Sequence, residues 1–288
     1  MALNKRTFLH TLLACILILL NMSTLSSAQE TKASLHKLLN LSGELTQGSA
    51  IIGKAPKGAK LSLNSKDIML TPEGEFFIGF GRDAKLTQNL SLVLSSGEQL
   101  SEQLTLAKRT YRIQKIEGVP QKTVSPRTQY RERIQTEKAL VYKARSTIST
   151  QHAFLEKFIA PMKSPITGVY GSQRVYNGTP KRPHFGVDYA GPIGAPVYAP
   201  ASGVVTLAHP DMFYSGGTLI IDHGYGVSSS FLHLSEIVVK SGQLVKQGDL
   251  IAKVGKGGRA TGPHLDWRMN WFDVRIDPLK VINIHKIN

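Results

Sequence analysis

The chain has 288 residues, a formal net charge of +15 at pH 7 and a single cysteine, Cys15. This length allows two modest domains, each able to bury a core of its own. One cysteine excludes a disulfide-stapled scaffold and a zinc site built from thiolates. The positive charge indicates an anionic partner or surface, and a merely soluble basic surface is the alternative.

The first 28 residues have the layout of a secretory signal peptide. Lys5 and Arg6 precede an almost purely apolar run from Phe8 to Met22, and small residues follow at 26–28. An uncleaved signal anchor is the alternative, although the run is short for a membrane span. Cys15 lies inside the run, where the apolar residues after it argue against lipidation. We therefore predict a periplasmic or secreted protein whose net charge falls to +13 on cleavage, because Lys5 and Arg6 are removed.

Export argues against nucleic acid as the anionic partner, and no recognition motif supports it. An acidic cell-wall polymer or a phospholipid headgroup layer fits the charge better. Protein partners cannot be named from this pattern.

Residues 29–125 are predicted to form a small β-sandwich. Short apolar or alternating segments are separated by glycine and proline turns, which is typical of antiparallel strands. The expected strands lie at 49–52, 60–63, 66–70, 75–80, 90–94 and 104–113. This part contains no catalytic constellation, so a regulatory or docking role is expected.

Residues 126–160 are predicted to be a helical linker. Apolar residues recur loosely at three- and four-residue steps among many charges, which is typical of an exposed helix with ion pairs. A helix that masks a groove until it is displaced is the alternative.

Residues 161–288 are predicted to form an all-β domain, because glycines punctuate short apolar segments and helical periodicity is nearly absent. The expected strands lie at 197–198, 204–208, 218–222, 227–232, 250–254 and 265–270. The predicted fold class is therefore all-β, with a helical connector between a small sandwich and a C-terminal sheet.

Five residues in the C-terminal part have the chemistry of a zinc site. His184 and Asp188 are four residues apart, and a second cluster contains His264 and Asp266. His233 supplies another imidazole between the two clusters. Imidazole nitrogen and carboxylate oxygen both suit Zn²⁺, and a catalytic zinc takes three protein ligands and keeps one position open.

The ordered motifs His184-x-x-x-Asp188, Phe231-Leu232-His233-Leu234 and Thr261-Gly262-Pro263-His264-Leu265 resemble the lysostaphin/LytM-type zinc metalloendopeptidases. These enzymes cut peptide cross-links of peptidoglycan and have the duplicated-hybrid-motif β fold. The resemblance covers roughly residues 165–280. It implies an antiparallel sheet with a groove that holds an extended peptide.

The resemblance implies that His184 and Asp188 are zinc ligands. The third ligand position of the family is a histidine, whereas this chain has Asp266 there. Aspartate is itself a competent zinc ligand, although two carboxylates weaken the pull of the ion on its water and favour a more alkaline optimum. The alternative is a catalytically inactive peptidoglycan-binding protein or amidase activator on the same fold.

His233 and His264 match the remaining family histidines, which act around the attacking water and the tetrahedral intermediate. One serves as general base, and the other, when protonated, stabilises the oxyanion. The sequence does not distinguish the two roles. The intact set of His184, Asp188, His233 and His264 favours an enzyme over an inactive homologue.

The substrate implied is the peptide part of peptidoglycan, and the sequence does not identify the bond. A link from D-Ala to diaminopimelate and a polyglycine bridge are both open. Arg182, Lys256 and Arg259 lie near the motifs and are candidates to meet a substrate carboxylate, such as that of meso-diaminopimelate.

Overall fold

The structure is a computed structural model that describes residues 34–285 of the chain. The predicted signal peptide over 1–28 lies outside the described residues. Within the described part, no helix combines the length and the apolar character needed to cross a membrane.

The chain divides into two compact units, Met1–Leu38 and Leu39–Asn288. Of the first unit, the structure describes one short helix, α2 (Leu35–Leu38). The second unit contains every other element, and most of these elements are strands in antiparallel sheets. The predicted all-β class is therefore confirmed.

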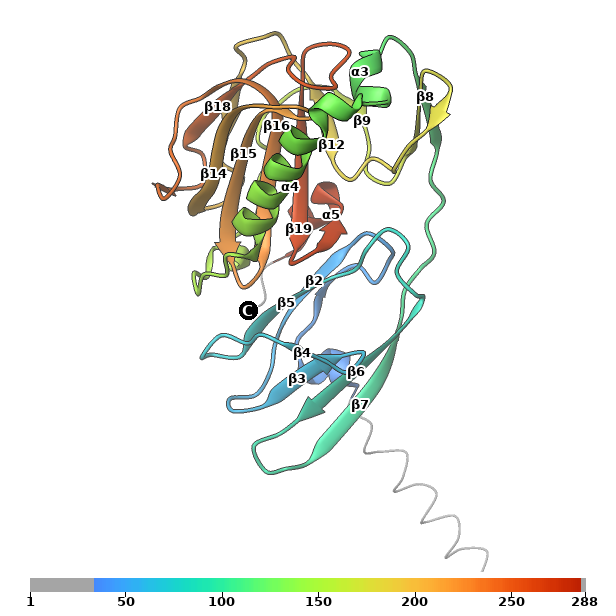
Figure 1. Ribbon diagram of the computed structural model, residues 1–288. Helices are drawn as coiled ribbons and strands as arrows, with labels where there is room; N and C mark the ends of the chain where they lie inside the picture. Colours follow the sequence, from blue (N-terminus) through green and yellow to red (C-terminus); the bar gives the residue numbers. More distant parts are fainter. Residues whose placement is uncertain (1–33, 286–288) are drawn as a thin grey trace, which may run out of the picture. The chain divides into compact units, whose positions relative to one another are not determined.

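The strands that precede residue 106 form two antiparallel sheets, as the spaced apolar segments predicted (Figure 1). One sheet has the order β1-β2-β5, with strands at Ser42–Gly43, Ala50–Lys54 and Glu75–Gly79. The other has the order β4-β3-β6-β7, with strands at Lys66–Ile68, Lys60–Leu63, Thr87–Val93 and Gln99–Thr105. Burial alternates along β6, where Leu90 and Leu92 face inward, as expected for a sheet with one covered face.

The prediction of one strand over 104–113 is wrong. Strand β7 ends at Thr105, and the next strand, β8 (Ile113–Ile116), pairs in parallel with β10 (Gln173–Tyr176). A short strand β11 (Thr179–Pro180) completes that sheet. The intervening residues leave the sheet because their side chains make polar contacts, described below.

The connector contains two helices and two 3-10 turns. Helix α3 (Gln121–Val124) and helix α4 (Arg131–Ser146) are joined by a 3-10 turn at Thr128–Tyr130, and a second such turn lies at Ala153–Leu155. Helix α4 begins near an acidic residue and ends with basic ones, which suits the helix dipole. It is not merely an exposed spacer, because it lies against the C-terminal sheet (Figure 1). Its Ala144 is buried with Leu207, Met212 and Ile220 of that sheet.

The C-terminal sheet has ten strands. Its main path is β17-β14-β15-β16-β19-β12-β9, with β13, β18 and β20 paired off this path. In chain order the strands are β9 Ile166–Gly168, β12 Val187–Ala190, β13 Pro196–Tyr198, β14 Gly203–Met212, β15 Gly216–Gly224, β16 Val227–Ile237, β17 Leu244–Val245, β18 Leu250–Val254, β19 His264–Trp271 and β20 Val274–Ile276. Helix α5 (Pro278–Ile282) follows. Strand β15 and the first eight residues of β16 are buried, and both strands carry polar residues among the apolar ones.

The sheet β1-β2-β5 shares a core with the C-terminal sheet. Ile52 and Phe77 lie opposite each other on β2 and β5, so their side chains share one face. These two residues and Ala50 belong to one buried cluster with residues far along the chain: Phe154, Trp267, Met269, Ile276 and Val281. The sheet β1-β2-β5 is therefore packed onto the C-terminal part and not only linked to it.

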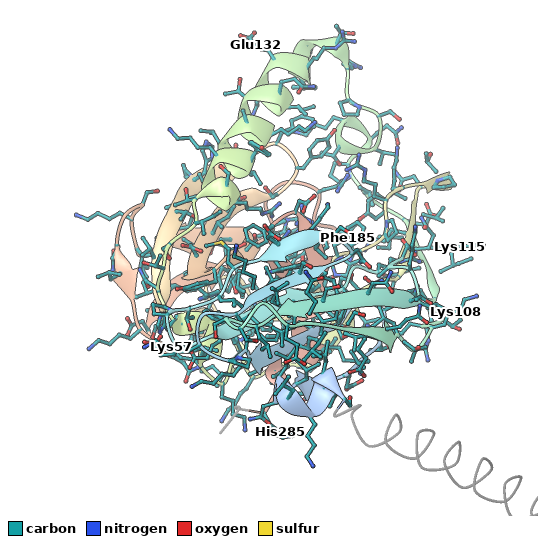
Figure 2. The ribbon with its side chains drawn as sticks, turned by 90° about the horizontal axis from the view of Figure 1, so that it is seen from below. Lys57, Lys108, Lys115, Glu132, Phe185 and His285 are labelled. Atoms are coloured by element: carbon teal, nitrogen blue, oxygen red, sulfur yellow. The ribbon has the colours of Figure 1, made fainter. Side chains whose placement is uncertain are left out.

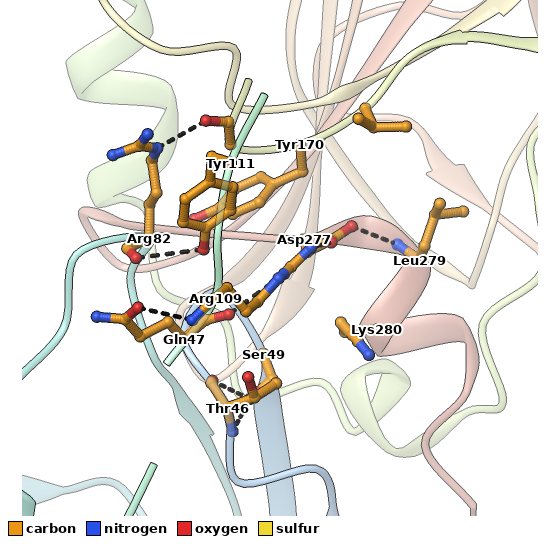
Figure 3. A network of polar contacts seen from close by, with 12 residues as sticks. Thr46, Gln47, Ser49, Arg82, Arg109, Tyr111, Tyr170, Asp277, Leu279 and Lys280 are labelled. Atoms are coloured by element: carbon orange, nitrogen blue, oxygen red, sulfur yellow. Dashed lines mark hydrogen bonds and ion pairs between the residues drawn. The ribbon is translucent and has the colours of Figure 1, made fainter. Parts of the chain in front are cut away.

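A polar network reinforces this contact (Figure 3). The guanidinium of Arg109 contacts Asp277 at 3.0 Å and donates to the carbonyl oxygen of Gln47 at 3.2 Å. The same guanidinium lies over the rings of Tyr111 and Tyr170. Asp277 also caps the start of helix α5 with its second oxygen. Burial raises the pKa of this carboxyl, and Arg109 partly offsets the effect.

The excess positive charge is carried in part by side chains that project from the surface. Lys57, Lys108 and Lys115 are exposed and point outward (Figure 2). None of the three forms an ion pair with another described residue.

The shared core predicts that the sheet β1-β2-β5 and the C-terminal sheet unfold together. Phe77 is 2% exposed, so Phe77→Ala should lower the free energy of unfolding by about 3–5 kcal/mol through lost burial and a residual cavity. Urea unfolding followed by tryptophan fluorescence measures this, because Trp267 lies in the same cluster. Leu86→Ala is the control, since Leu86 is 39% exposed. Two separate transitions, with the fluorescence midpoint unchanged in Phe77→Ala, would contradict a shared core.

Candidate metal centre

Two neighbouring strands place the candidate ligands. Strands β12 and β19 pair in antiparallel fashion, and Asp188 lies directly opposite Asp266. Side chains two residues apart on a strand face the same side, so His264, Asp266 and Arg268 project from one face. His184 lies just before β12, four residues from Asp188. The structure therefore brings together residues that are about eighty positions apart in the chain.

His184, Asp188 and Asp266 form a group that could hold a metal ion. One ligand atom from each lies within 4.8 Å of the others, and the residues are 1%, 6% and 0% exposed. The Nε2 atom of His184 is 3.1 Å from Oδ1 of Asp188. Ligand atoms at about 2.0–2.2 Å from one zinc ion lie at most about 4.4 Å apart, so small side-chain adjustments bring the group to that geometry.

Three polar atoms at this point lack the partners that buried polar atoms normally have. Both ring nitrogens of His184 and Oδ1 of Asp188 are buried without a well-aligned hydrogen bond among the described residues, although Nε2 and Oδ1 lie 3.1 Å apart. Burying a polar atom without a partner lowers the stability of the fold. A metal ion would provide a partner for Oδ1 and for one ring nitrogen. The residues present thus fit a cation.

Two glycines make room for the carboxylates. A Cβ atom at Gly168 would overlap Oδ2 of Asp188, and one at Gly186 would overlap Oδ1 of Asp266. Any other residue at either position would displace a candidate ligand.

Each carboxylate is paired with an arginine, of which Arg174 is buried and Arg268 half-buried. Both oxygens of Asp266 accept from Nε of Arg268, at 3.0 and 3.1 Å, and Nη2 of Arg268 reaches Oδ2 at 2.5 Å. Oδ2 of Asp188 accepts from Nη2 of Arg174. Burial alone would raise the pKa of Asp266, but the Arg268 guanidinium holds it well below its usual range. Burial likewise opposes ionisation of Asp188, whose pKa is lowered by His184 and Arg174.

The charge of Arg268 compensates for the aspartate at the third candidate ligand position. Replacing a neutral imidazole by Asp266 adds one negative charge to the site, and Arg268 adds one positive charge directly beside it. The net charge felt by a bound cation is therefore close to that of a set with two histidines and one aspartate. A carboxylate oxygen has two lone pairs, so Oδ1 of Asp266 keeps one free while Arg268 is bound.

The two predicted catalytic histidines lie next to each other. The ring centroids of His233 and His264 are 4.8 Å apart, and Nε2 of His264 is 3.9 Å from Oδ1 of Asp188. Nδ1 of His233 lies 2.8 Å from the carbonyl of Gly257, and Nδ1 of His264 lies 2.9 Å from that of Gly262. A carbonyl oxygen only accepts, so each Nδ1 carries the proton and each neutral ring keeps the Nε2 lone pair free.

His233 occupies a special backbone position. Strand β16 pairs with β19 up to Leu232 and with β18 from Leu234, so His233 stands where the strand changes partner. Its φ is +65°, in the left-handed region that non-glycine residues rarely adopt. Burial and the neighbouring His264 lower the pKa of His233 to about 4, so this imidazole is neutral at pH 7.

The group opens into a cavity of about 450 Å³. Asp188, Asp266, His233 and His264 line it, together with five arginines at positions 145, 174, 259, 268 and 275. Part of the wall comes from α4 and from the segment around β8, including Val141, Gln114 and Ile116. Of the three basic residues expected near a substrate, Arg259 lines this cavity, whereas Arg182 lines a neighbouring one of about 720 Å³ and Lys256 lines neither.

Four of these arginines were not predicted from the sequence. Arg268 was detectable, because its spacing places it on the same strand face as Asp266. Arg174 lies on β10 and Arg145 on α4, and nothing in the local sequence links them to the site. Arg275, on β20, follows the motif but carries no pattern of its own.

A family model matches this part of the chain. Residues 182–278 match the model of Peptidase family M23. This segment resembles a peptidase family M23 domain. All five predicted site residues lie within it.

Curated relatives match part of the chain. Over 100 residues the chain is 45% identical to the peptidoglycan DD-endopeptidase ShyB of Vibrio cholerae, covering 34% of this chain and 23% of that protein. Over 124 residues it is 40% identical to the peptidoglycan DD-endopeptidase ShyA of the same organism, covering 42% and 28%. The chain thus spans roughly a quarter of the length of these relatives.

One solved structure matches well beyond the M23 domain. It is a crystal structure assigned to peptidase M23 from Pseudomonas aeruginosa, with a TM-score of 0.65 and 28% identity. The match covers 83% of this chain and 95% of that one. The arrangement of strands around the M23 domain therefore recurs in a second protein.

The buried histidine His223 on strand β15 predicts a loss of stability in acid. His223 is 0% exposed and lies 2.7 Å from the Ser202 carbonyl and 2.8 Å from Oγ of Ser229. Burial lowers the pKa of His223 to about 4, against about 6.5 in the unfolded chain. The contribution of neutral His223 to the free energy of unfolding is therefore complete above pH 6.5. It decreases by up to about 3 kcal/mol as the pH falls toward 4.

Urea unfolding at pH 7.5, 6 and 4.5 measures this loss. The decline between pH 6.5 and 4 should be smaller in His223→Gln and unchanged in His285→Gln, since His285 is exposed. Equal declines in the wild type and in His223→Gln would show that another group is responsible.

Proposed function

We propose that this chain is a zinc-dependent endopeptidase that hydrolyses peptide cross-links of peptidoglycan. The observation that carries the proposal is the buried group of His184, Asp188 and Asp266, which opens into a cavity beside His233 and His264. The M23 match and the relatives named peptidoglycan DD-endopeptidase support it.

We assign His184, Asp188 and Asp266 as the zinc ligands. Oδ1 of Asp188 and one ring nitrogen of His184 have no other partner, and Oδ1 of Asp266 retains a free lone pair. Zinc supplies Lewis-acid polarisation of the scissile carbonyl and lowers the pKa of water. Arg174 and Arg268 fix the orientation of the two carboxylates, as hydrogen-bonded partners of metal ligands commonly do.

His264 and His233 act on protons at the reacting centre. Each presents Nε2 as an acceptor, because the Gly262 and Gly257 carbonyls hold the proton on Nδ1. We assign His264, whose Nε2 is 3.9 Å from Asp188 Oδ1, as the general base for the attacking water. Neutral His233 has no proton on Nε2 to donate to an oxyanion, so we assign it to accept a hydrogen bond from the attacking water and orient that water beside His264.

We place the reaction outside the cytoplasm, in the periplasm or in a secreted form, because peptidoglycan lies there. The signal peptide over 1–28 and the domain limits at 29–125, 126–160 and 161–288 remain predictions. The substrate is the stem peptide, and an anionic envelope polymer or membrane surface is a second contact suggested by the charge. The rival function is a catalytically inactive peptidoglycan-binding protein or amidase activator on the same fold, which the names of the relatives do not favour.

The ligand assignment predicts which substitutions remove the metal. Protein purified without chelator should carry about one zinc per chain, and Asp188→Ala or Asp266→Ala should lose most of it, since each removes one of three ligands. Elemental analysis of the dialysed proteins measures the content. Asp249→Ala is the matched control, because Asp249 is exposed and accepts from the amide of Lys246. Full zinc content in Asp266→Ala would reject Asp266 as a ligand.

The activity is tested by digesting purified cross-linked sacculi and analysing the muropeptides by mass spectrometry. The wild type with zinc should convert cross-linked dimers to monomers, and the mass of the products identifies the bond. Asp188→Ala should be inactive, and His264→Ala should lower kcat by about 10²- to 10⁴-fold, the usual range for loss of a general base. Zinc-loaded protein that leaves every cross-link intact would favour the inactive homologue.

A further inference from the structure

The cavity at the metal centre contains more positive charge than its aspartates balance. Its described lining includes five arginines and two aspartates. Arg174 and Arg268 pair with the aspartates. Arg145, Arg259 and Arg275 form no ion pair with any carboxylate among the described residues. Three positive charges therefore face one cavity without a counter-ion, and a bound metal ion adds to this excess.

Of the three arginines, Arg145 has the most poorly satisfied hydrogen-bond donors. It lies on α4, and its Nη2 donates to Oγ of Ser230 at 3.0 Å. Its Nε is buried without a hydrogen-bond partner among the described residues. Burial lowers the pKa of Arg145, and Arg275 and Arg268 lower it further. A partly buried guanidinium that faces two others is unfavourable unless an anion binds between them.

Arg275 approaches the same place from the sheet. It lies on β20, and its Nη1 donates to Oδ1 of Asn270 at 3.3 Å, a long contact with a neutral group. Burial and Arg268 lower the pKa of Arg275 to about 10. Both arginines thus have neutral side-chain acceptors and retain free donors.

The two arginines stand where two cavities meet. Arg145 and Arg275 line the cavity of about 450 Å³ at the metal centre and also the neighbouring one of about 720 Å³. Two acids line the second cavity. Glu137 forms an ion pair with Arg133 and accepts a hydrogen bond from the amide of Phe213, and Asp273 is exposed. A peptide chain that runs from one cavity into the other passes the two arginines before it reaches the metal centre.

We propose that Arg145 and Arg275 form a subsite for a free carboxylate of the substrate peptide, beside the scissile bond. This inference rests on the proposed function and specifies its substrate as a peptide with an unamidated carboxylate near the bond that is cut. Guanidinium groups bind carboxylates through paired hydrogen bonds, and a buried setting strengthens such contacts. In this account α4 is a wall of the substrate groove and not a cover that must be displaced.

Two cross-linked peptide substrates that differ in one group test the subsite. One carries free carboxylates next to the cross-link, and the other carries carboxamides at the same positions. Arg145→Gln and Arg275→Gln should each raise KM for the carboxylate substrate about tenfold, with kcat little changed, because one charge-assisted contact is lost. KM for the carboxamide substrate should not change. Arg131→Gln is the matched control, because Arg131 is exposed on the same helix and lines neither cavity.

A binding measurement separates failure of the subsite from failure of the proposed function. Titration calorimetry compares uncross-linked stem peptides with free and amidated carboxylates on the zinc-loaded protein. The wild type should prefer the free carboxylate about tenfold, and Arg145→Gln should lose that preference while Arg145→Lys keeps part of it. This preference in a protein that cleaves nothing would uphold the subsite and reject the enzyme.

Three results would overturn the inference. The first is equal affinity of the wild type for the two peptides. The second is a rise in the turnover of both substrates in Arg145→Gln, which would identify α4 as a cover held over the groove. The third is binding of inorganic phosphate as tight as that of the carboxylate peptide and equally lost in Arg145→Gln, which would mark a general anion site.

Discussion

The position of Asp188 opposite Asp266 on adjacent strands is the constraint on which the site depends. The register of β12 and β19 forces two carboxylates into one buried space, where their negative charges repel. Such a pair is stable only with positive charge around it. Arg174 and Arg268 supply part of that charge, and the unpartnered atoms of His184 and Asp188 mark where a cation supplies the rest.

The same constraint explains the small residues around the site. Gly168 on β9 and Gly186 before β12 leave room for the carboxylate oxygens, so neither position can carry a larger residue. It also explains how an aspartate can replace the histidine that the motif leads one to expect. The positive charge of Arg268 offsets the negative charge that Asp266 adds. It therefore counteracts the shift to a more alkaline pH optimum that two carboxylates alone would cause. Position 268 is therefore as important to the chemistry as position 266.

Much of the fold and of the metal group was predictable from local patterns. Strands such as Lys60–Leu63 and Leu250–Val254 lie where alternation and flanking glycines place them. His184, Asp188 and Asp266 were predictable because ordered motifs carried them. The prediction of a strand over 104–113 was wrong because Arg109 forms an ion pair with Asp277, which is 168 residues away in the chain.

The arginines show a second limit of sequence reasoning. Arg145 comes to the site from a helix predicted to be a spacer, and Arg174 from a strand that was not foreseen. Only the packing of α4 on the sheet, through Ala144 and Ile220, brings Arg145 to the cavity. Likewise, the packing of Phe77 against the C-terminal core was invisible, because a buried phenylalanine does not specify its partners. Long-range packing decides both features, and periodicity reports only on local structure.

The central claim is that Asp266, supported by Arg268, completes the zinc site. X-ray absorption at the zinc edge of the loaded protein tests it most directly, because imidazole rings and carboxylate oxygens scatter differently. The account predicts a single imidazole and oxygen ligands at about 2.0–2.2 Å, with one oxygen fewer from the protein in Asp266→Ala. A spectrum with two imidazoles in the wild type would mean that another histidine, such as His264, takes the third position, and it would contradict the account.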